Sequence, residues 1–394
     1  MNKKSHEKIA LLLHSAIVLV ISYLVVSLIM GSIHSLALFS VVEEGELPMS
    51  DMYMFINSKR NPAKLNTDIT LVDIDACKDR SEIALLIEQI DSLQPKVIGL
   101  DVFFRNRKEP NEDSVLENAI NRCKNIVVAC EIDEDHEVKD AYSICHHNFF
   151  VTPEKNNFIA GFINLDSHGG SSVRTFTPKL FPPEKQSLDT LYSFAVQTAK
   201  FCNETAFQKL LQRPGNSELI NYQPIRFYEI DKNEISDNTK WITGKIVLLG
   251  SLSEDDVHKT PINPQMQMHG VEIHAYIIST IFEGKYINRL DNIGTKIINI
   301  LICYLFTMLC WYAATRLHKG VHILIKFSEV AIIFLAFFAG YFLFNRYHIV
   351  ITYSKAIIVM GIVFLIVELY HIGIEFGENC IHKFKNRRHE KGNC

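Results

Sequence analysis

The feature that most limits what this chain can fold into is a long apolar run near its amino terminus. Between Ile9 and Val42 there is no Asp, Glu, Lys or Arg, and residues 9–31 alone are long enough to cross a lipid bilayer as a helix. Residues 297–315, 325–344 and 349–370 are three further apolar runs of similar length. Buried soluble helices give runs of this kind too, but four of them in one chain favour four transmembrane helices.

Charge predicts how these helices are oriented. Residues 43–292 carry 26 Lys and Arg against 38 Asp and Glu, a net charge of −12, whereas the rest of the chain has a net charge of +8. Eleven of the fourteen basic residues outside this segment lie on one side of the apolar runs: Lys3, Lys4, Lys8, Arg316, Lys319, Lys326, Lys383, Lys385, Arg387, Arg388 and Lys391. Because short loops rich in Lys and Arg stay in the cytoplasm, residues 1–8 and the basic tail 371–394 are predicted to be cytoplasmic. Residues 43–292 then form one large domain in the periplasm or outside the cell.

The first apolar run is predicted to be an uncleaved anchor. It begins after a basic stretch, as a signal peptide does, but its apolar region exceeds the usual length of about 7–15 residues. No clear A-x-A cleavage site follows it.

The nine cysteines do not form a recognisable disulfide framework or zinc motif. Five lie in the outer segment with irregular spacing, so one or two bridges are compatible with an oxidising compartment, and no CxxC pair occurs. Cys145, His146 and His147 are residues of types that often ligate metals. They lie in an irregular polar stretch, however, which favours a surface loop without a metal. The sequence therefore predicts no metal and no cofactor, and the acidic charge of the outer segment disfavours nucleic acid as a partner.

The start of the outer segment alternates between strand and helix patterns. Residues 68–75, 96–104 and 125–132 are short apolar runs typical of buried strands, whereas residues 81–93 and 113–123 have helical spacing. Strands and helices that alternate with short connections form βαβ units. The predicted fold is therefore an α/β domain, a parallel sheet with covering helices, joined to one transmembrane helix before it and three after it.

The second half of the segment is less regular. Residues 134–155 are predicted to form a loop or a weak hairpin. Residues 158–165 and 172–178 are two short strand patterns that flank a Gly-rich turn, which predicts a hairpin. Residues 245–250 form another buried strand pattern, and residues 269–284 a helix that Gly284 ends.

Several of these pieces together resemble the type-two CHASE domain, an extracellular sensory module of bacterial receptors. The resemblance rests on "DID" at Asp73–Asp75, "KVIGLDVFF" with Asp101, and "GFINLDSHGGSSVRTF" with Asp166 and Arg174. The closing stretch is the most specific part, with these residues of the family pattern: Gly250, Asp256, Thr260, Pro261, Gly270, His274 and Ala275. One departure is that the short "ACKD" stretch stands where the family has a Trp-Pro-Trp-Arg-like turn.

The resemblance implies a sensory or regulatory protein of the bacterial inner membrane. Family members generally continue into a cyclase or kinase domain, whereas this chain ends about 25 residues after its last apolar run. A separate cytoplasmic effector is therefore expected to receive the signal. By analogy with the family, a homodimer is expected.

The candidate site lies where strands end in polar residues. In open α/β sheets, ligands bind outside the carboxyl ends of the strands, which here carry Asp73 and Asp75, then Asp101, and then Ser251 to His258. If these ends are neighbours, their side chains can hold a small ligand or a cation. The structural alternative is that each aspartate caps a helix or fixes a turn.

Two further residues complete the candidate set. His274 lies on an apolar helix face, where a hydrogen-bonded core histidine is the more common role. Arg174 can hold an anion through its planar guanidinium, or pair with Asp166 across the predicted hairpin.

The sequence thus predicts a non-catalytic sensor that binds a ligand or an envelope protein outside the cell. The alternatives are a membrane-anchored metal-dependent hydrolase, because carboxylates with a histidine can activate water on a metal, and a scaffold subunit of an envelope complex.

Overall fold

The computed structural model describes most of the 394 residues, and they form two compact units. The units are Met1–Ser50 with Asn288–Cys394, and Asp51–Ile287. The described residues are 3–35, 49–135, 138, 140–150, 159–165, 172–182, 190–253, 256–290, 293–316, 319–351 and 354–391.

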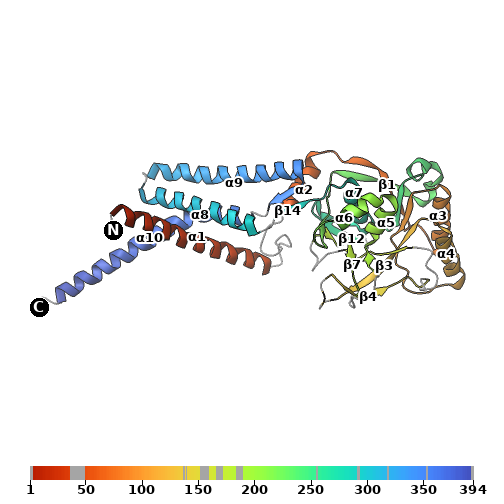
Figure 1. Cartoon of the computed structure of the whole chain (residues 1–394), viewed down its shortest axis with the longest axis horizontal. Coiled ribbons are helices and arrows are strands. Elements are labelled where there is room, and N and C mark those ends of the chain that lie inside the picture. The colour runs from red at the N-terminus through yellow and green to blue at the C-terminus, as the bar shows by residue number, and fades with distance from the viewer. Residues whose placement is uncertain are drawn as a thin grey trace. The chain divides into compact units, whose positions relative to one another are not determined.

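The unit Asp51–Ile287 is built on a seven-stranded sheet (Figure 1). Its order is β10-β1-β11-β2-β3-β4, and β5 also pairs with β3. The strands are β10 (Ile225–Asp231), β1 (Lys64–Asp73), β11 (Ile246–Gly250), β2 (Val97–Leu100), β3 (Ile126–Glu134), β4 (Tyr142–His146) and β5 (Ile159–Phe162). All pairs are parallel except β3 with β4. The predicted α/β fold is therefore confirmed.

Helices cover both faces of this sheet. On one face α3 (Arg80–Ser92) and α4 (Pro110–Arg122) pack against each other, and their side chains share an apolar core with β2 and β3. On the other face lie α5 (Phe194–Cys202) and α7 (Gly270–Glu283), with α6 (Glu204–Leu211) packed on both. Capping defines the helix ends: the Asp79 side chain accepts hydrogen bonds from the backbone N–H groups of Ser81 and Glu82 in α3, and Gly284 ends α7 with a φ of 61°.

A glycine in β5 sets how closely α5 approaches the sheet. A Cβ atom added at Gly161 would lie 2.6 Å from the Phe194 Cα, a backbone atom at the start of α5. Only glycine leaves room for this contact between strand and helix.

The predicted hairpin between residues 158–165 and 172–178 is wrong. β5 pairs in parallel with β3, and β6 (Thr175–Phe176) pairs with β9 (Glu218–Leu219). The apolar residues of β5 are buried by extending the central sheet, a long-range pairing that a local turn signal does not reveal. The residues of the turn itself, 166–171, lie outside the described residues.

Shorter elements complete the unit. They are α2 (Met49–Arg60), the strand pairs β7 (Lys179–Leu180) with β8 (Leu191–Tyr192) and β12 (Val257–Thr260) with β13 (Asn263–His269), and the 3-10 turns Lys232–Glu234 and Ser236–Trp241.

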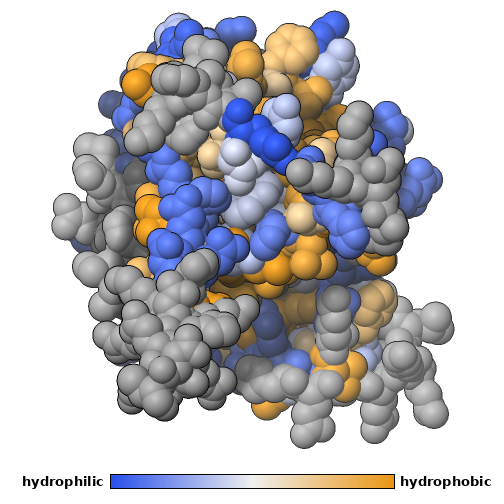
Figure 2. Space-filling view, turned by 90° about the vertical axis from the view of Figure 1, so that its left-hand side faces the viewer, coloured by the Kyte–Doolittle hydropathy of each residue, from blue (hydrophilic) through white to orange (hydrophobic). Residues whose placement is uncertain are grey.

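The second unit contains four long apolar helices, as predicted: α1 (Lys3–Ser35), α8 (Ile293–Arg316), α9 (Lys319–Tyr347) and α10 (Ser354–Lys391). Their candidate membrane spans are His6–Ile29, Ile293–Arg316, Ile325–Tyr347 and Lys355–Ile381. Val18, Cys303 and Phe364 are buried where α1, α8 and α10 pack together. Many other apolar side chains of these helices remain at the surface. On the face drawn in Figure 2, hydrophobic residues in orange lie among hydrophilic ones in blue. This outward apolar surface suits helices that contact lipid.

The last predicted span, residues 349–370, begins later in the structure. Ile349–Ile351 form a short strand, β15, that pairs in parallel with β14 (Asn288–Leu290), and the helix follows from Ser354. β14 directly precedes α8, and β15 lies between α9 and α10.

Candidate functional site

The parallel pairing of β1, β11 and β2 brings the predicted strand ends to one edge of the sheet. Asp73 is opposite Gly250, and Leu249 is opposite Leu100. The backbone N–H of Asp101 donates to the Leu249 carbonyl at 2.8 Å. Polar residues that follow three different strands are therefore neighbours, as expected of the carboxyl edge.

Asp73, Asp75 and Ser251 build the turns at this edge. Asp73 Oδ1 accepts from the Asp75 backbone N–H, and Asp75 Oδ2 accepts from the N–H of Leu252, each at 2.9 Å. The Ser251 hydroxyl lies 2.9 Å from the hydroxyl of Ser253. Burial raises the pKa of Asp73. These bonds correspond to the structural alternative, in which side-chain oxygens fix turns.

Asp101, Asp256 and His274 instead line a cavity of about 820 Å³. Its other walls come from β3, β4 and the residues after β5. The lining residues are Asp101, Phe103, Arg105, Glu131, Ile132, Asp133, Cys145, His146, His147, Ile163, Asn164, Leu165, Asp256, His258, Gly270 and His274.

The pKa values of two carboxyl groups in this cavity are shifted in opposite directions. Burial raises the pKa of Asp101 to about 8, and the negative charge of Asp256 adds to the rise. A hydrogen bond from His258, at 3.2 Å, lowers the pKa of Asp256. Near neutral pH the cavity therefore presents one protonated carboxyl group, a donor, beside one carboxylate, an acceptor.

His274 contributes a buried imidazole to the same cavity. Its side chain projects from α7, is 3% exposed and lies edge-on to Phe194 at a centroid distance of 5.2 Å. Burial lowers its pKa to about 4, so the ring is neutral. Among the described residues, no group forms a hydrogen bond with its Nδ1 atom. A buried polar atom without a partner is uncommon, and here it belongs to a residue that lines a cavity.

Gly270 allows Asp256 to lie against the start of α7. A Cβ atom at this position would be 2.5 Å from Asp256 Oδ2, so any other residue displaces the carboxylate. The first turn of a helix carries partial positive charge, which stabilises a carboxylate placed there.

Arg174 is not among the residues that line the cavity. It is 4% exposed, and its Nε donates to Asp51 Oδ2 on α2 at 2.6 Å, a buried ion pair. Its predicted alternative partner, Asp166, lies outside the described residues.

Sequence reasoning missed the contribution of β3 and β4. Pairing of these strands brings Glu131 and Asp133 beside residues 145–147, and His146 Nε2 lies 2.8 Å from Asp133 Oδ2. Arg105 pairs with Glu131 at the same wall. The available signal in the sequence was the spacing of Cys145 and His147, which are two residues apart. This spacing places both side chains on one face only if the segment is extended, as it is at β4.

The fold and the cavity together define a class of protein, a chain with four candidate membrane spans and an α/β domain between the first and the second of them. A family model described as "CHASE2 domain" matches residues 23–314, and the chain therefore belongs to the CHASE2 family of sensory domains. No curated protein and no solved structure matches the chain.

Proposed function

We propose that this protein is a sensor that binds a small polar ligand in the cavity at the carboxyl edge of the sheet. The observation that carries the proposal is His274, whose buried Nδ1 has no hydrogen-bond partner among the described residues, beside Asp101 and Asp256. A ligand with both donor and acceptor groups can pair with the Asp256 carboxylate and the protonated Asp101 carboxyl, and a rotation of the His274 ring would bring its Nδ1 within reach of the same ligand. This role is non-catalytic and needs no cofactor.

The proposed location is the bacterial inner membrane, with the α/β unit in the periplasm or outside and both termini in the cytoplasm. The support is the positive charge that flanks the apolar runs on one side. The lipid bilayer is then the partner of α1, α8, α9 and α10, and the acidic outer unit is not expected to bind nucleic acid.

The proposed output is a shift in the packing of the four helices, which a separate cytoplasmic effector reads. His14 of α1 illustrates how these helices are joined: its Nδ1 lies 3.1 Å from the Tyr370 hydroxyl, and its ring stacks on Trp311 at 4.9 Å. Polar contacts between spans are costly to leave unmade, so they favour a few discrete arrangements. α10 continues as a helix from the end of its span at Ile381 to Lys391, and we propose this segment as the contact with the effector. We also propose that the protein forms a homodimer, which would present two copies of this α10 segment to the effector.

Cross-linking in native membranes tests the proposal. A photoreactive side chain near Lys391 is expected to capture one cytoplasmic protein, identified by mass spectrometry. His274→Gln should change the cross-linking yield, because it alters the cavity. Asp68→Asn, which removes an exposed carboxylate of β1, is the matched control and should leave the yield unchanged.

Two results would replace the sensor proposal. Equal cross-linking in all three proteins indicates a constant partner and favours the scaffold. Turnover of a substrate by the purified chain, lost in Asp256→Asn, favours the hydrolase.

A further inference from the structure

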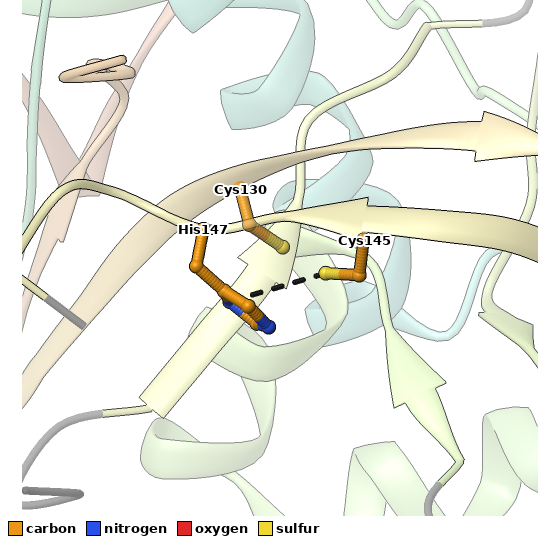
Figure 3. Close-up of side chains that lie close together, drawn as sticks. All are labelled: Cys130, Cys145 and His147. Carbon is orange, nitrogen blue, oxygen red and sulfur yellow. Dashed lines mark hydrogen bonds between the residues drawn. The ribbon is translucent and has the colours of Figure 1, made fainter. Parts of the chain in front are cut away.

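Three side chains with metal-binding atoms converge where β3 pairs with β4. Ile132 is opposite Cys145 and Glu131 is opposite His146 in the antiparallel register. Continued by one residue, this register places Cys130 opposite His147. Since side chains alternate between faces of a sheet, Cys130, Cys145 and His147 share one face, and Figure 3 shows the three side chains close together.

The separations suit a shared ion. Cys145 Sγ lies 3.9 Å from His147 Nδ1, and the ligand atoms of all three residues lie within 4.8 Å of one another. Tetrahedral zinc, with Zn–S near 2.3 Å and Zn–N near 2.0–2.1 Å, holds such atoms roughly 3.5–3.8 Å apart. Small side-chain rotations therefore close the cluster around an ion without moving the strands.

The same register disfavours a disulfide bond. Cys130 is the diagonal neighbour of Cys145, and diagonal positions in a sheet are about 7–8 Å apart. A disulfide needs Cβ atoms about 3.5–4.5 Å apart, closer than in the average diagonal pair, so the register makes a bridge less favourable.

We propose that Cys130, Cys145 and His147 bind one Zn²⁺ ion. Thiolate and imidazole ligands select soft or borderline metals, and two thiolates neutralise the charge of the ion. Cys145 and His147 also line the cavity, and His147 is exposed, so the ion has a path from solvent. Three protein ligands leave the fourth coordination position open toward the cavity, where water or a ligand atom completes the tetrahedron. The site depends on the pairing of β3 with β4 and not on the sensory role of the cavity.

Metal analysis of the full chain tests the proposal. The protein is purified in detergent from cells grown with added zinc, and its metal content is measured by inductively coupled plasma mass spectrometry. One zinc per chain is expected, with at least a tenfold loss in Cys145→Ser and in His147→Ala. The matched controls, His146→Ala and Cys202→Ser, should keep their zinc, because His146 contacts Asp133 and Cys202 lies on α5.

A second measurement does not depend on how the variants fold. In the wild-type chain, a chelator should make the half-buried Cys145 reactive toward an alkylating reagent, and added zinc should protect it again. The proposal is overturned if the wild-type chain holds no zinc, if His147→Ala retains it, or if Cys130 and Cys145 are recovered as a disulfide. These measurements use zinc and a chelator but no sensed ligand, so they test the zinc site separately from the sensor role. A chain that binds zinc but does not signal would contradict the proposed function and leave the zinc site intact.

Discussion

Two glycines of the α/β unit look alike in the sequence but face different neighbours. The Cβ position of Gly161 meets the backbone of Phe194 at 2.6 Å, whereas the atoms nearest to that of Gly270 belong to the side-chain carboxylate of Asp256. Gly161→Ala is therefore expected to lower the free energy of unfolding by about 1–3 kcal/mol, because the helix backbone has to shift. Gly270→Ala should cost less than about 1 kcal/mol, since the carboxylate can rotate away.

The melting temperatures of the two variants provide the comparison. Equal losses would show that the contact of Gly161 with the α5 backbone does not limit packing. Gly270→Ala should also alter ligand binding in the cavity, because it displaces Asp256.

The raised pKa of Asp101 predicts a pH dependence. In the unfolded chain this carboxyl ionises near pH 3.8, whereas in the folded chain it stays protonated up to about pH 8. The folded state thus binds more protons between these values, and the contribution of Asp101 to stability falls as the pH rises through this window. Asp101→Asn removes this loss, so the variant should gain stability relative to the wild type from pH 5 to 8, by at most ~1.4 kcal/mol per pH unit.

Thermal unfolding of both proteins across that range checks the expectation, with Asp68→Asn on the surface of β1 as the control. Parallel pH profiles of Asp101→Asn and the wild type would contradict it.

At the scale of residues, the sequence indicates the cavity only in part. Asp101, Asp256 and His274 were identifiable because they follow strands or lie in a specific closing pattern, and the structure brings them together. Asp73, Asp75 and Ser251 also follow strands, but their side chains form hydrogen bonds within turns and do not line the cavity. The sequence does not reveal this difference, because it depends on the direction in which each side chain points. Cys130 had no signal, because its neighbours in the cluster are set by the register of β4.

Among the elements, α2 is held to the α/β unit by a buried ion pair. Asp51 and Arg174 are 15% and 4% exposed at the side chain, and their atoms lie 2.6 Å apart. Asp51→Asn replaces the charged acceptor of the Arg174 Nε–H by a neutral amide in a buried setting, which should lower the free energy of unfolding by about 3 kcal/mol. For a unit of this size the melting temperature then falls by roughly 6–12 °C.

The control is Glu88→Gln, which removes the exposed pair of Glu88 with Arg122 between α3 and α4, and should cost less than about 1 kcal/mol. Similar melting temperatures for the two variants would mean that Arg174 does not depend on Asp51.

The elements that sequence patterns predicted best are those with strong local signals. β1, β11, α3, α4 and α7 follow apolar periodicity and capping residues, so their positions were predicted to within a few residues. The pairing of β5 and β6 was not, because their partners, β3 and β9, lie far away in the sequence. Periodicity predicts that a strand exists, whereas the identity of its neighbour depends on the packing of the whole sheet.

For the whole molecule, the proposed orientation predicts a protease experiment. A protease added to intact spheroplasts should digest the unit Asp51–Ile287 and leave a C-terminal epitope tag after Cys394 uncut. Loss of the tag with survival of the α/β unit would reverse the orientation. Lysed cells provide the control, in which both parts are digested.

The number of spans was predictable because it depends on composition and length alone. Orientation relies on charge, which biases membrane insertion, and so it stays a prediction. The point where the last helix begins was misplaced, since Ile349–Ile351 are as apolar as a helix but are hydrogen-bonded to β14.

The short pair of β14 and β15 has a mechanical consequence. β14 precedes α8 in the chain, and all three of its residues pair with β15, which lies between α9 and α10. A pull on Asn288 therefore reaches three helices at once instead of travelling down α8 alone. We expect the strand pair to couple the movements of α8, α9 and α10, so that these three helices are displaced together. In the described part of the chain, α1 is not joined to this strand pair, and it is expected to move independently of it.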